Sequence, residues 1–133
     1  MKVMIMKRTI FIIALFLMLY GCRNSYELSM ERGEYYYDIG AYESATLEYK
    51  SVVNHYPRDV RVLNERTIHM LANAHHNLAV IFLKRSTLTE DPIEKSSFLQ
   101  EAHDEAKWAY YLYPKDAYKE TWDSITATLY ANK

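Results

Sequence analysis

Helix-breaking residues are scarce in most of this chain, and their scarcity limits the folds open to it. Residues 22–133 contain two glycines and three prolines. Apolar residues recur there at intervals of three and four, and no segment shows the alternation typical of a half-buried strand. We therefore expect an all-α domain over residues 26–133, built from long helices joined by short turns.

Turn and capping residues predict where the first helices begin and end. Two helices are expected over about residues 26–39 and 42–55, separated by Gly40, which suits the left-handed turn that follows a helix. Asp59 is expected to cap a third helix that ends at about residue 85, and whether residues 60–85 form one continuous helix is left open. At 26 residues, it would be unusually long.

Acidic residues beside prolines predict the remaining helix starts. Asp91, Pro92 and Glu94 supply an N-cap, a proline at the first helical position and a glutamate three residues after the cap. The helix that they start is expected to reach about residue 112, and Asp116 is expected to cap a last helix. This C-terminal capping helix should have one apolar face, formed by Tyr118, Trp122, Ile125 and Leu129.

Small and aromatic residues follow a recognisable order over residues 26–59. They are Gly33, Tyr36, Gly40, Tyr42, Ala45, Tyr49 and Pro57. Their order and spacing resemble a tetratricopeptide repeat, or TPR, in which two antiparallel helices form a hairpin. The resemblance implies that Gly33 and Ala45 are small where the two helices approach closely, with Tyr36 and Tyr49 filling the space beside them.

A second copy of this pattern is similar but enlarged. It comprises Leu78, Ala79, Phe82, Ala102, Ala109 and Pro114. Pro57 and Pro114 are 57 residues apart, whereas the standard unit has about 34. Departures from the family pattern occur at Ser29, Arg32, His75 and Ala106, and an unrelated antiparallel helical bundle with chance matches is the alternative.

The TPR resemblance implies a scaffold whose concave face binds a peptide or a partner protein. The implied groove residues lie on the first helix of each hairpin: Met30, Glu34, Tyr37, Asp38, Asn73, His76, Val80, Leu83 and Lys84. We expect Tyr37 to be the aromatic anchor, with ordinary packing of its ring as the equally weighted alternative. For Glu34 and Asp38 the alternative is a solvated helix face.

An apolar segment preceded by basic residues opens the chain. Lys2, Lys7 and Arg8 come before an unbroken apolar run from Ile10 to Leu19. As a helix, residues 10–22 would span roughly 20 Å, less than the roughly 30 Å of a bilayer core. Residues 1–21 are therefore expected to be a signal peptide, with Met6 as an alternative start.

The sequence Leu19-Tyr20-Gly21-Cys22 resembles the lipobox of bacterial lipoproteins, although Tyr20 replaces the usual small residue. The resemblance implies cleavage before Cys22 and lipid attachment to that cysteine, with residues 22–25 as a short tether. It also implies a cell-envelope location, in the outer membrane and facing the periplasm of a two-membrane bacterium, because Arg23 is not the aspartate typical of inner-membrane retention. A plain signal peptide or uncleaved anchor is the alternative.

Several functional classes find little support in the sequence. Loss of three cations with the signal peptide takes the net charge from −1 to −4, and no basic stripe predicts nucleic-acid binding. There is no phosphate-binding glycine loop and no serine nucleophile motif, and Cys22 is the single cysteine. We therefore expect a binding protein without catalytic activity or cofactor, whose partners are an envelope protein or peptide and, through its lipid, a membrane.

Two alternatives to the adaptor interpretation stay open. A ligand- or metal-binding lipoprotein would use His69, His76 and His103, but only if their nitrogens converged. A self-assembling structural lipoprotein is suggested because about three repeats are needed for an independent solenoid, whereas two are visible. A homo-oligomer would supply the missing contacts.

Overall fold

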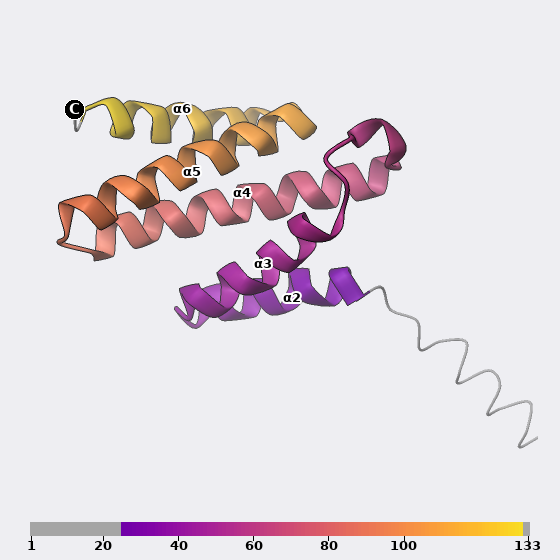
Figure 1. Cartoon of the computed structure of the whole chain (residues 1–133), viewed down its shortest axis with the longest axis horizontal. Helices are drawn as coiled ribbons and strands as arrows, with labels where there is room; N and C mark the ends of the chain where they lie inside the picture. Colours follow the sequence, from indigo (N-terminus) through magenta and orange to yellow (C-terminus); the bar gives the residue numbers. More distant parts are fainter. Residues whose placement is uncertain (1–24, 132–133) are drawn as a thin grey trace, which may run out of the picture.

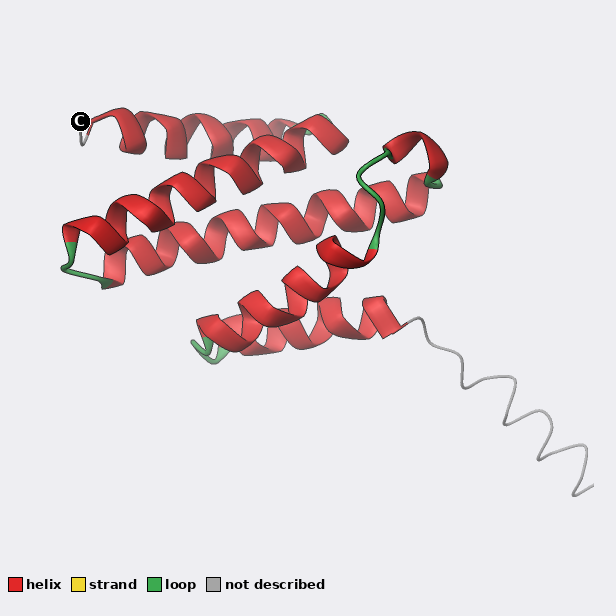
Figure 2. Cartoon of the chain, viewed as in Figure 1, coloured by secondary structure: helices red, strands yellow, loops and turns green. Residues whose placement is uncertain are grey.

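The computed structural model describes residues 25–131; the expected signal peptide, Cys22 and residues 23–24 lie outside this range. The described chain consists of helices and short connections (Figure 2), which confirms the all-α expectation. No helix within it has the length and apolarity to cross a membrane. The elements are α2 (Ser25–Asp38), α3 (Tyr42–His55), the 3-10 helix η1 (Val60–Val62), α4 (Glu65–Leu88), α5 (Pro92–Leu112) and α6 (Asp116–Ala131).

Successive α-helices run in opposite directions and form a stack (Figure 1). Helices α2 and α3 form a first hairpin, the longer α4 and α5 form a second, and α6 packs on α5. One end of the molecule gathers the start of α2, the α3–α4 connection and the α5–α6 turn (Figure 1). The opposite end carries the turns inside the two hairpins. The two ends therefore carry different connections of the chain.

The turn between α2 and α3 depends on Gly40, as expected. Its φ of 76° lies in the left-handed region that glycine adopts without a steric penalty. The N–H of Ala41 donates to the carbonyl of Tyr36 at 2.8 Å, and the N–H of Gly40 donates to that of Tyr37 at 3.0 Å. These two bonds are the Schellman motif, which satisfies carbonyls at the end of α2.

The close approach of α2 and α3 is confirmed at Gly33. A Cβ on Gly33 would lie 2.7 Å from Cζ of Tyr49, a distance that would force the ring to move. Ala45 and Tyr49 are both buried beside it. A glycine in the interior of a helix is therefore explained by the aromatic ring that occupies the space where its side chain would be.

The expected third helix begins five residues late. Asp59 caps η1 instead, through a 3.1 Å bond from the Arg61 N–H, and Leu63 is extended. Asn64 caps α4 by accepting the N–H of Thr67 at 2.9 Å. Residues 60–85 are therefore not one continuous helix, and the prediction of Asp59 as the cap of the long helix was wrong. The apolar spacing continues through the break because Leu63 still packs against the core.

The start of α5 confirms Asp91 as a cap but changes the role of Glu94. Asp91 accepts the Ile93 N–H at 2.9 Å, and Pro92 is the first helical residue. The Asp91 N–H donates to the Thr89 hydroxyl at 3.2 Å, and that hydroxyl donates to Glu94. The Thr89 hydroxyl therefore connects the Asp91 N–H to the Glu94 carboxylate, two groups that bond to each other directly in a capping box.

Helix α6 covers α5 with the expected face but not with the expected cap. Tyr118, Ile125 and Leu129 are buried, and Trp122 is half-buried. Asp116 lies inside the first turn of α6, so its prediction as the cap was wrong. The carbonyl of Lys115 accepts the N–H of Lys119 at 3.1 Å and begins the helical bonding.

Candidate interaction surface

A hollow of about 430 Å³ lies between α2 and α4 and contains two of the expected groove residues, Met30 and Asn73. Met30 and Met70 pack partly against the core and form an apolar floor. An ion pair between Glu27 and Arg66 joins the two helices at this hollow. The hollow therefore combines flexible apolar side chains with positively and negatively charged residues. Its lining is completed by Glu31, Thr67 and His69.

Three other expected groove residues, Glu34, Tyr37 and Asp38, influence the buried hydroxyl of Tyr49. Burial of the Tyr49 phenol raises its pKa to about 12, the carboxylates of Glu34 and Asp38 and the phenol of Tyr37 also raise it, and a hydrogen bond with Asn77 lowers it. This group lies where α2, α3 and α4 meet. It is built around a tyrosine that the sequence assigned to the core.

Of the residues around Tyr49, Tyr37 was among the expected groove residues, whereas Asn77 was not. The Tyr37 ring is half-buried and packs edge-on against Tyr42, with ring centroids 5.6 Å apart. Asn77 follows Asn73 by four residues, so helical spacing could have placed it on the same side of α4. The bond between Asn77 and Tyr49 depends on how the hairpins pack, and no local pattern predicts it.

His76 does not belong to this surface, contrary to the expectation. Its ring lies 4.7 Å from that of Tyr118 on α6, and burial followed by the charge of Lys115 lowers the His76 pKa. Within residues 25–131 its Nδ1 atom is buried without a hydrogen-bond partner. Because α4 contacts α3, α5 and α6, side chains on different sides of α4 meet different neighbours.

The remaining groove candidates are further along α4 and outside the hollow. Leu83 packs partly against the core, Val80 is half-buried and Lys84 is exposed. The nine expected residues are therefore not one continuous lining. They divide into the hollow at Met30 and Asn73, the group around Tyr49, the contact beneath α6, and the C-terminal half of α4.

The three histidines of the metal hypothesis contact different aromatic residues. His69 lies against Tyr113, with ring centroids 4.0 Å apart. The Trp122 indole N–H donates to Nε2 of His103 at 3.1 Å, which occupies a nitrogen that a metal would need. Among the described residues, no three histidine, cysteine, aspartate or glutamate side chains come together as a metal site. The convergence that this alternative required is absent from residues 25–131.

A second polar feature, which the sequence did not indicate, pairs His75 with Glu105. Nδ1 of His75 donates to the Glu105 carboxylate at 2.5 Å, linking α4 to α5. The pair lines a cleft of about 240 Å³, together with residues that include Val60 and Trp108. The two partners are 30 residues apart in the chain, so their pairing depends on the register between the two helices.

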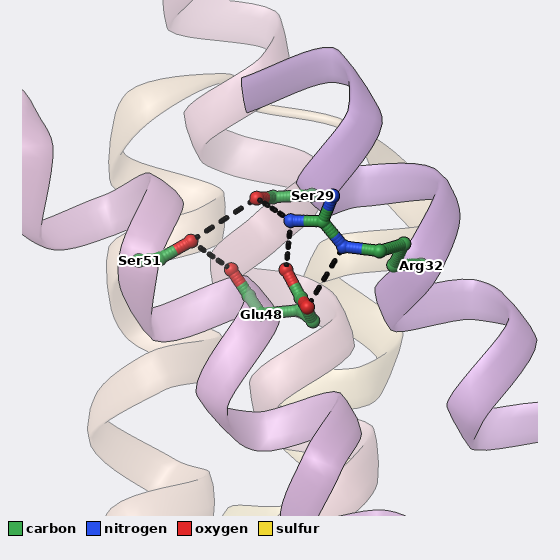
Figure 3. A network of polar contacts seen from close by, with 4 residues as sticks. All are labelled: Ser29, Arg32, Glu48 and Ser51. Atoms are coloured by element: carbon green, nitrogen blue, oxygen red, sulfur yellow. Dashed lines mark hydrogen bonds and ion pairs between the residues drawn. The ribbon is translucent and has the colours of Figure 1, made fainter. Parts of the chain in front are cut away.

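The first hairpin carries a polar network on α2 and α3 (Figure 3). Arg32 donates to both carboxylate oxygens of Glu48, at 2.8 and 2.9 Å, and to the hydroxyl of Ser29 at 3.1 Å. The hydrogen bonds from Arg32 lower the Glu48 pKa. Ser51 donates to the hydroxyl of Ser29 at 3.3 Å. Ser29 is buried at a position where the TPR pattern favours an aromatic residue, and its hydroxyl therefore has hydrogen-bond partners there.

The hollow and the cleft have the chemistry of binding surfaces, because each is lined by both apolar and polar residues. Both are formed between helices of different hairpins. The chain matches no family model, no curated protein and no solved structure.

Proposed function

We propose that this protein is a lipid-anchored adaptor that binds a protein or peptide partner in a bacterial cell envelope. The observation that carries the proposal is the hollow between α2 and α4, which contains Met30 and Asn73. In this proposal the hairpins are of the TPR type, supported by the approach of Gly33 to Tyr49 and by the Gly40 turn. The lipid is attached at Cys22, which follows the apolar segment and the lipobox-like residues. The anchored domain faces the periplasm from the outer membrane.

The hollow suits a peptide segment that presents one apolar side chain. The thioethers of Met30 and Met70 can adapt to a side chain placed on the floor. The Asn73 amide offers both a donor and an acceptor to a peptide group, and the charged edge at Glu27 and Arg66 would orient the segment. Binding then needs no large rearrangement of the two hairpins.

The test is capture of partners from membranes by the acylated protein carrying Asn73→Arg. Asn73 is exposed, so the larger cationic side chain should fill the hollow without disturbing the core. A loss of affinity of about tenfold or more is expected, because blocking the centre of an interface commonly costs more than about 1.4 kcal/mol. Gln100→Arg introduces the same side chain at an exposed amide residue on α5 that lines neither the hollow nor the cleft.

Partners retained by Gln100→Arg and lost by Asn73→Arg would support the hollow as the binding site. Equal capture by the native protein and by Asn73→Arg, with unchanged helical content, would exclude the hollow. Equal loss in both variants would indicate an effect of added charge and would also exclude a specific site there.

A further inference from the structure

The proposed acylation determines which end of the domain meets the membrane, and this inference rests on that part of the proposed function. Cys22 precedes Ser25, the first residue of α2, by three positions. Three residues of chain reach about 10 Å at full extension. The start of α2 is therefore held within about 10 Å of the lipid-bearing residue.

Side-chain contacts join the start of α2 to two other segments at the same end. Glu27 of α2 forms an ion pair with Arg66 in the first turn of α4. Three residues further along α4, His69 packs against Tyr113, which directly follows α5. The beginning of α2, the beginning of α4 and the end of α5 therefore lie together, on the side from which the chain enters the domain (Figure 1).

This end exposes side chains that favour a membrane interface. Val62 is 70% exposed, Trp108 is 40% exposed, Tyr111 is 68% exposed and Tyr113 is 39% exposed. The rings of Trp108 and Tyr111 meet edge-on with centroids 5.5 Å apart, beside a hollow of about 400 Å³ that includes Lys107. Tryptophan and tyrosine concentrate at the headgroup level of bilayers, because one end of each side chain is apolar and the other polar.

Basic side chains at this end could contact lipid phosphates. Arg58, Arg61, Lys107 and Lys115 are all exposed. Two carboxylates nearby are held by arginines, Asp59 by Arg61 and Glu27 by Arg66, whereas Asp104, which lines the same hollow as Lys107, and Glu65 are exposed. Long basic side chains can keep their charges among headgroups while their carbon stems lie on apolar surface.

The opposite end exposes apolar side chains too, among them Ile39, Leu88 and Ile93, but the tether holds the other end of the domain next to the bilayer. Helix α4 has 24 residues and is about 36 Å long, several times the reach of the tether. Tether length therefore selects the end that carries Trp108. The occupant of the exposed apolar surface there is the bilayer from which the tether extends.

We propose that the domain docks on the phospholipid surface through a membrane-proximal face formed by Val62, Trp108, Tyr111 and Tyr113. The rings lie at the headgroup level, and Lys107 and Arg58 contact phosphates. Docking holds the stack of helices in one orientation on the membrane, with its hairpin turns pointing away. The lipid supplies attachment, and the face supplies orientation.

Tryptophan fluorescence tests this inference directly, because the chain contains Trp108 and Trp122 as its two tryptophans. The full acylated protein is reconstituted in phosphatidylcholine–phosphatidylethanolamine vesicles that contain brominated phospholipid as quencher. In Trp122→Phe the remaining Trp108 should show blue-shifted, strongly quenched emission. In Trp108→Phe the remaining Trp122, half-buried and bonded to His103, should be quenched much less.

Introducing negative charge into the face supplies the comparison, in the Trp122→Phe background. Val62→Glu with Tyr111→Glu should abolish quenching of Trp108 while the protein stays on the vesicles through its lipid. Ile93→Glu, which introduces a charge at an exposed apolar residue of the opposite end, should leave the quenching intact. Circular dichroism checks that all variants are folded.

Fatty-acid labelling of Cys22 separates the two proposals. A labelled, vesicle-bound protein whose Trp108 is quenched no more than its Trp122 would overturn membrane docking alone. Equal loss of quenching in Ile93→Glu and in the double variant would overturn the assignment of the face. Absence of label on the native protein would overturn both the proposed anchor and the docking that depends on it.

Discussion

At the scale of single residues, the contact between Gly33 and Tyr49 sets how closely the first hairpin can pack. Alanine normally stabilises a helix interior by about 1 kcal/mol relative to glycine. At Gly33 the added methyl carbon would lie 2.7 Å from a buried ring, so this gain is opposed by overpacking. The glycine is therefore required by its neighbour and not by its own backbone.

We expect Gly33→Ala to destabilise the native protein by about 1–2 kcal/mol, because overpacking exceeds the gain in helix propensity. In a Tyr49→Leu background, where the ring is absent, the same substitution should become stabilising. Urea unfolding of the four proteins in this cycle measures the coupling. Gly40→Ala is the control: its cost comes from the positive φ, so it should be the same in both backgrounds. Additive effects of Gly33→Ala and Tyr49→Leu would contradict the packing argument.

Tyr49 should also make stability depend on alkaline pH. Its pKa is raised to about 12 in the folded protein, mainly by burial, whereas an unfolded tyrosine titrates near about 10. A raised pKa favours folding below pH about 10, and that contribution, roughly 3 kcal/mol, is lost as the pH rises from about 10 to about 12. Tyr49→Phe should show a shallower fall in the free energy of unfolding over this range.

Tyr35→Phe serves as the comparison for that experiment, because the Tyr35 side chain is exposed and gains little protection on folding. Its stability profile should parallel that of the native protein. Identical slopes for Tyr49→Phe and the native protein would show that the Tyr49 hydroxyl is not protected from solvent.

At the scale of elements, the start of α4 is decided by competition between two capping residues. Asp59 accepts a backbone N–H at the start of η1, and Asn64 accepts a backbone N–H in the first turn of a helix of 24 residues. The extended backbone at Leu63 separates the two caps. Apolar spacing alone did not reveal this break, because Leu63 remains in contact with the core on both interpretations.

Removal of the Asn64 cap should therefore cost more than removal of the Asp59 cap. Asn64→Ala is expected to lower the free energy of unfolding by about 1 kcal/mol, the usual loss for an N-cap. Asp59→Ala removes a cap from an exposed 3-10 turn and an exposed ion pair, which solvent screens, so a smaller loss is expected. Thermal or urea unfolding measures both. The reverse order would favour a helix that begins at residue 60.

At the scale of the whole molecule, the end that gathers the start of α2, the α3–α4 connection and the α5–α6 turn is the end nearest to Cys22 in the sequence (Figure 1). A lipid at that position would place the hollow between α2 and α4 close to the membrane, because Glu27 and Arg66 border it. The proposed partner would then be one that works at the membrane surface.

Cys22→Ser should abolish incorporation of radiolabelled fatty acid and leave the precursor uncleaved by the lipoprotein peptidase. The native protein should label and fractionate with the outer membrane, since more than one acyl chain gives stable attachment whereas one is marginal. Normal labelling of Cys22→Ser would exclude this cysteine as the acceptor. Fractionation of the labelled native protein with the inner membrane would contradict the sorting expected from Arg23.

Features that depend on neighbours along the chain could be predicted from the sequence. Gly40 ends α2, and Asp91 and Pro92 start α5. Intervals of four, three and four residues between the apolar side chains give α6 its core-facing side, formed by Tyr118, Trp122, Ile125 and Leu129. Each of these effects acts within one or two helical turns. The placement of Gly33 beside Tyr49 was also predictable, because the repeat pattern encodes one hairpin with a short turn.

Contacts between helices were decided only by the tertiary structure. His75 with Glu105, Trp122 with His103, and Asn77 with Tyr49 are partners 19 to 30 residues apart. Whether such side chains meet depends on the crossing and register of two helices, which in turn depend on packing summed over many residues. For the same reason, His76, expected in the groove, lies beneath α6. A rotation of about 100° per residue along α4 is enough to move a side chain from one neighbouring helix to another.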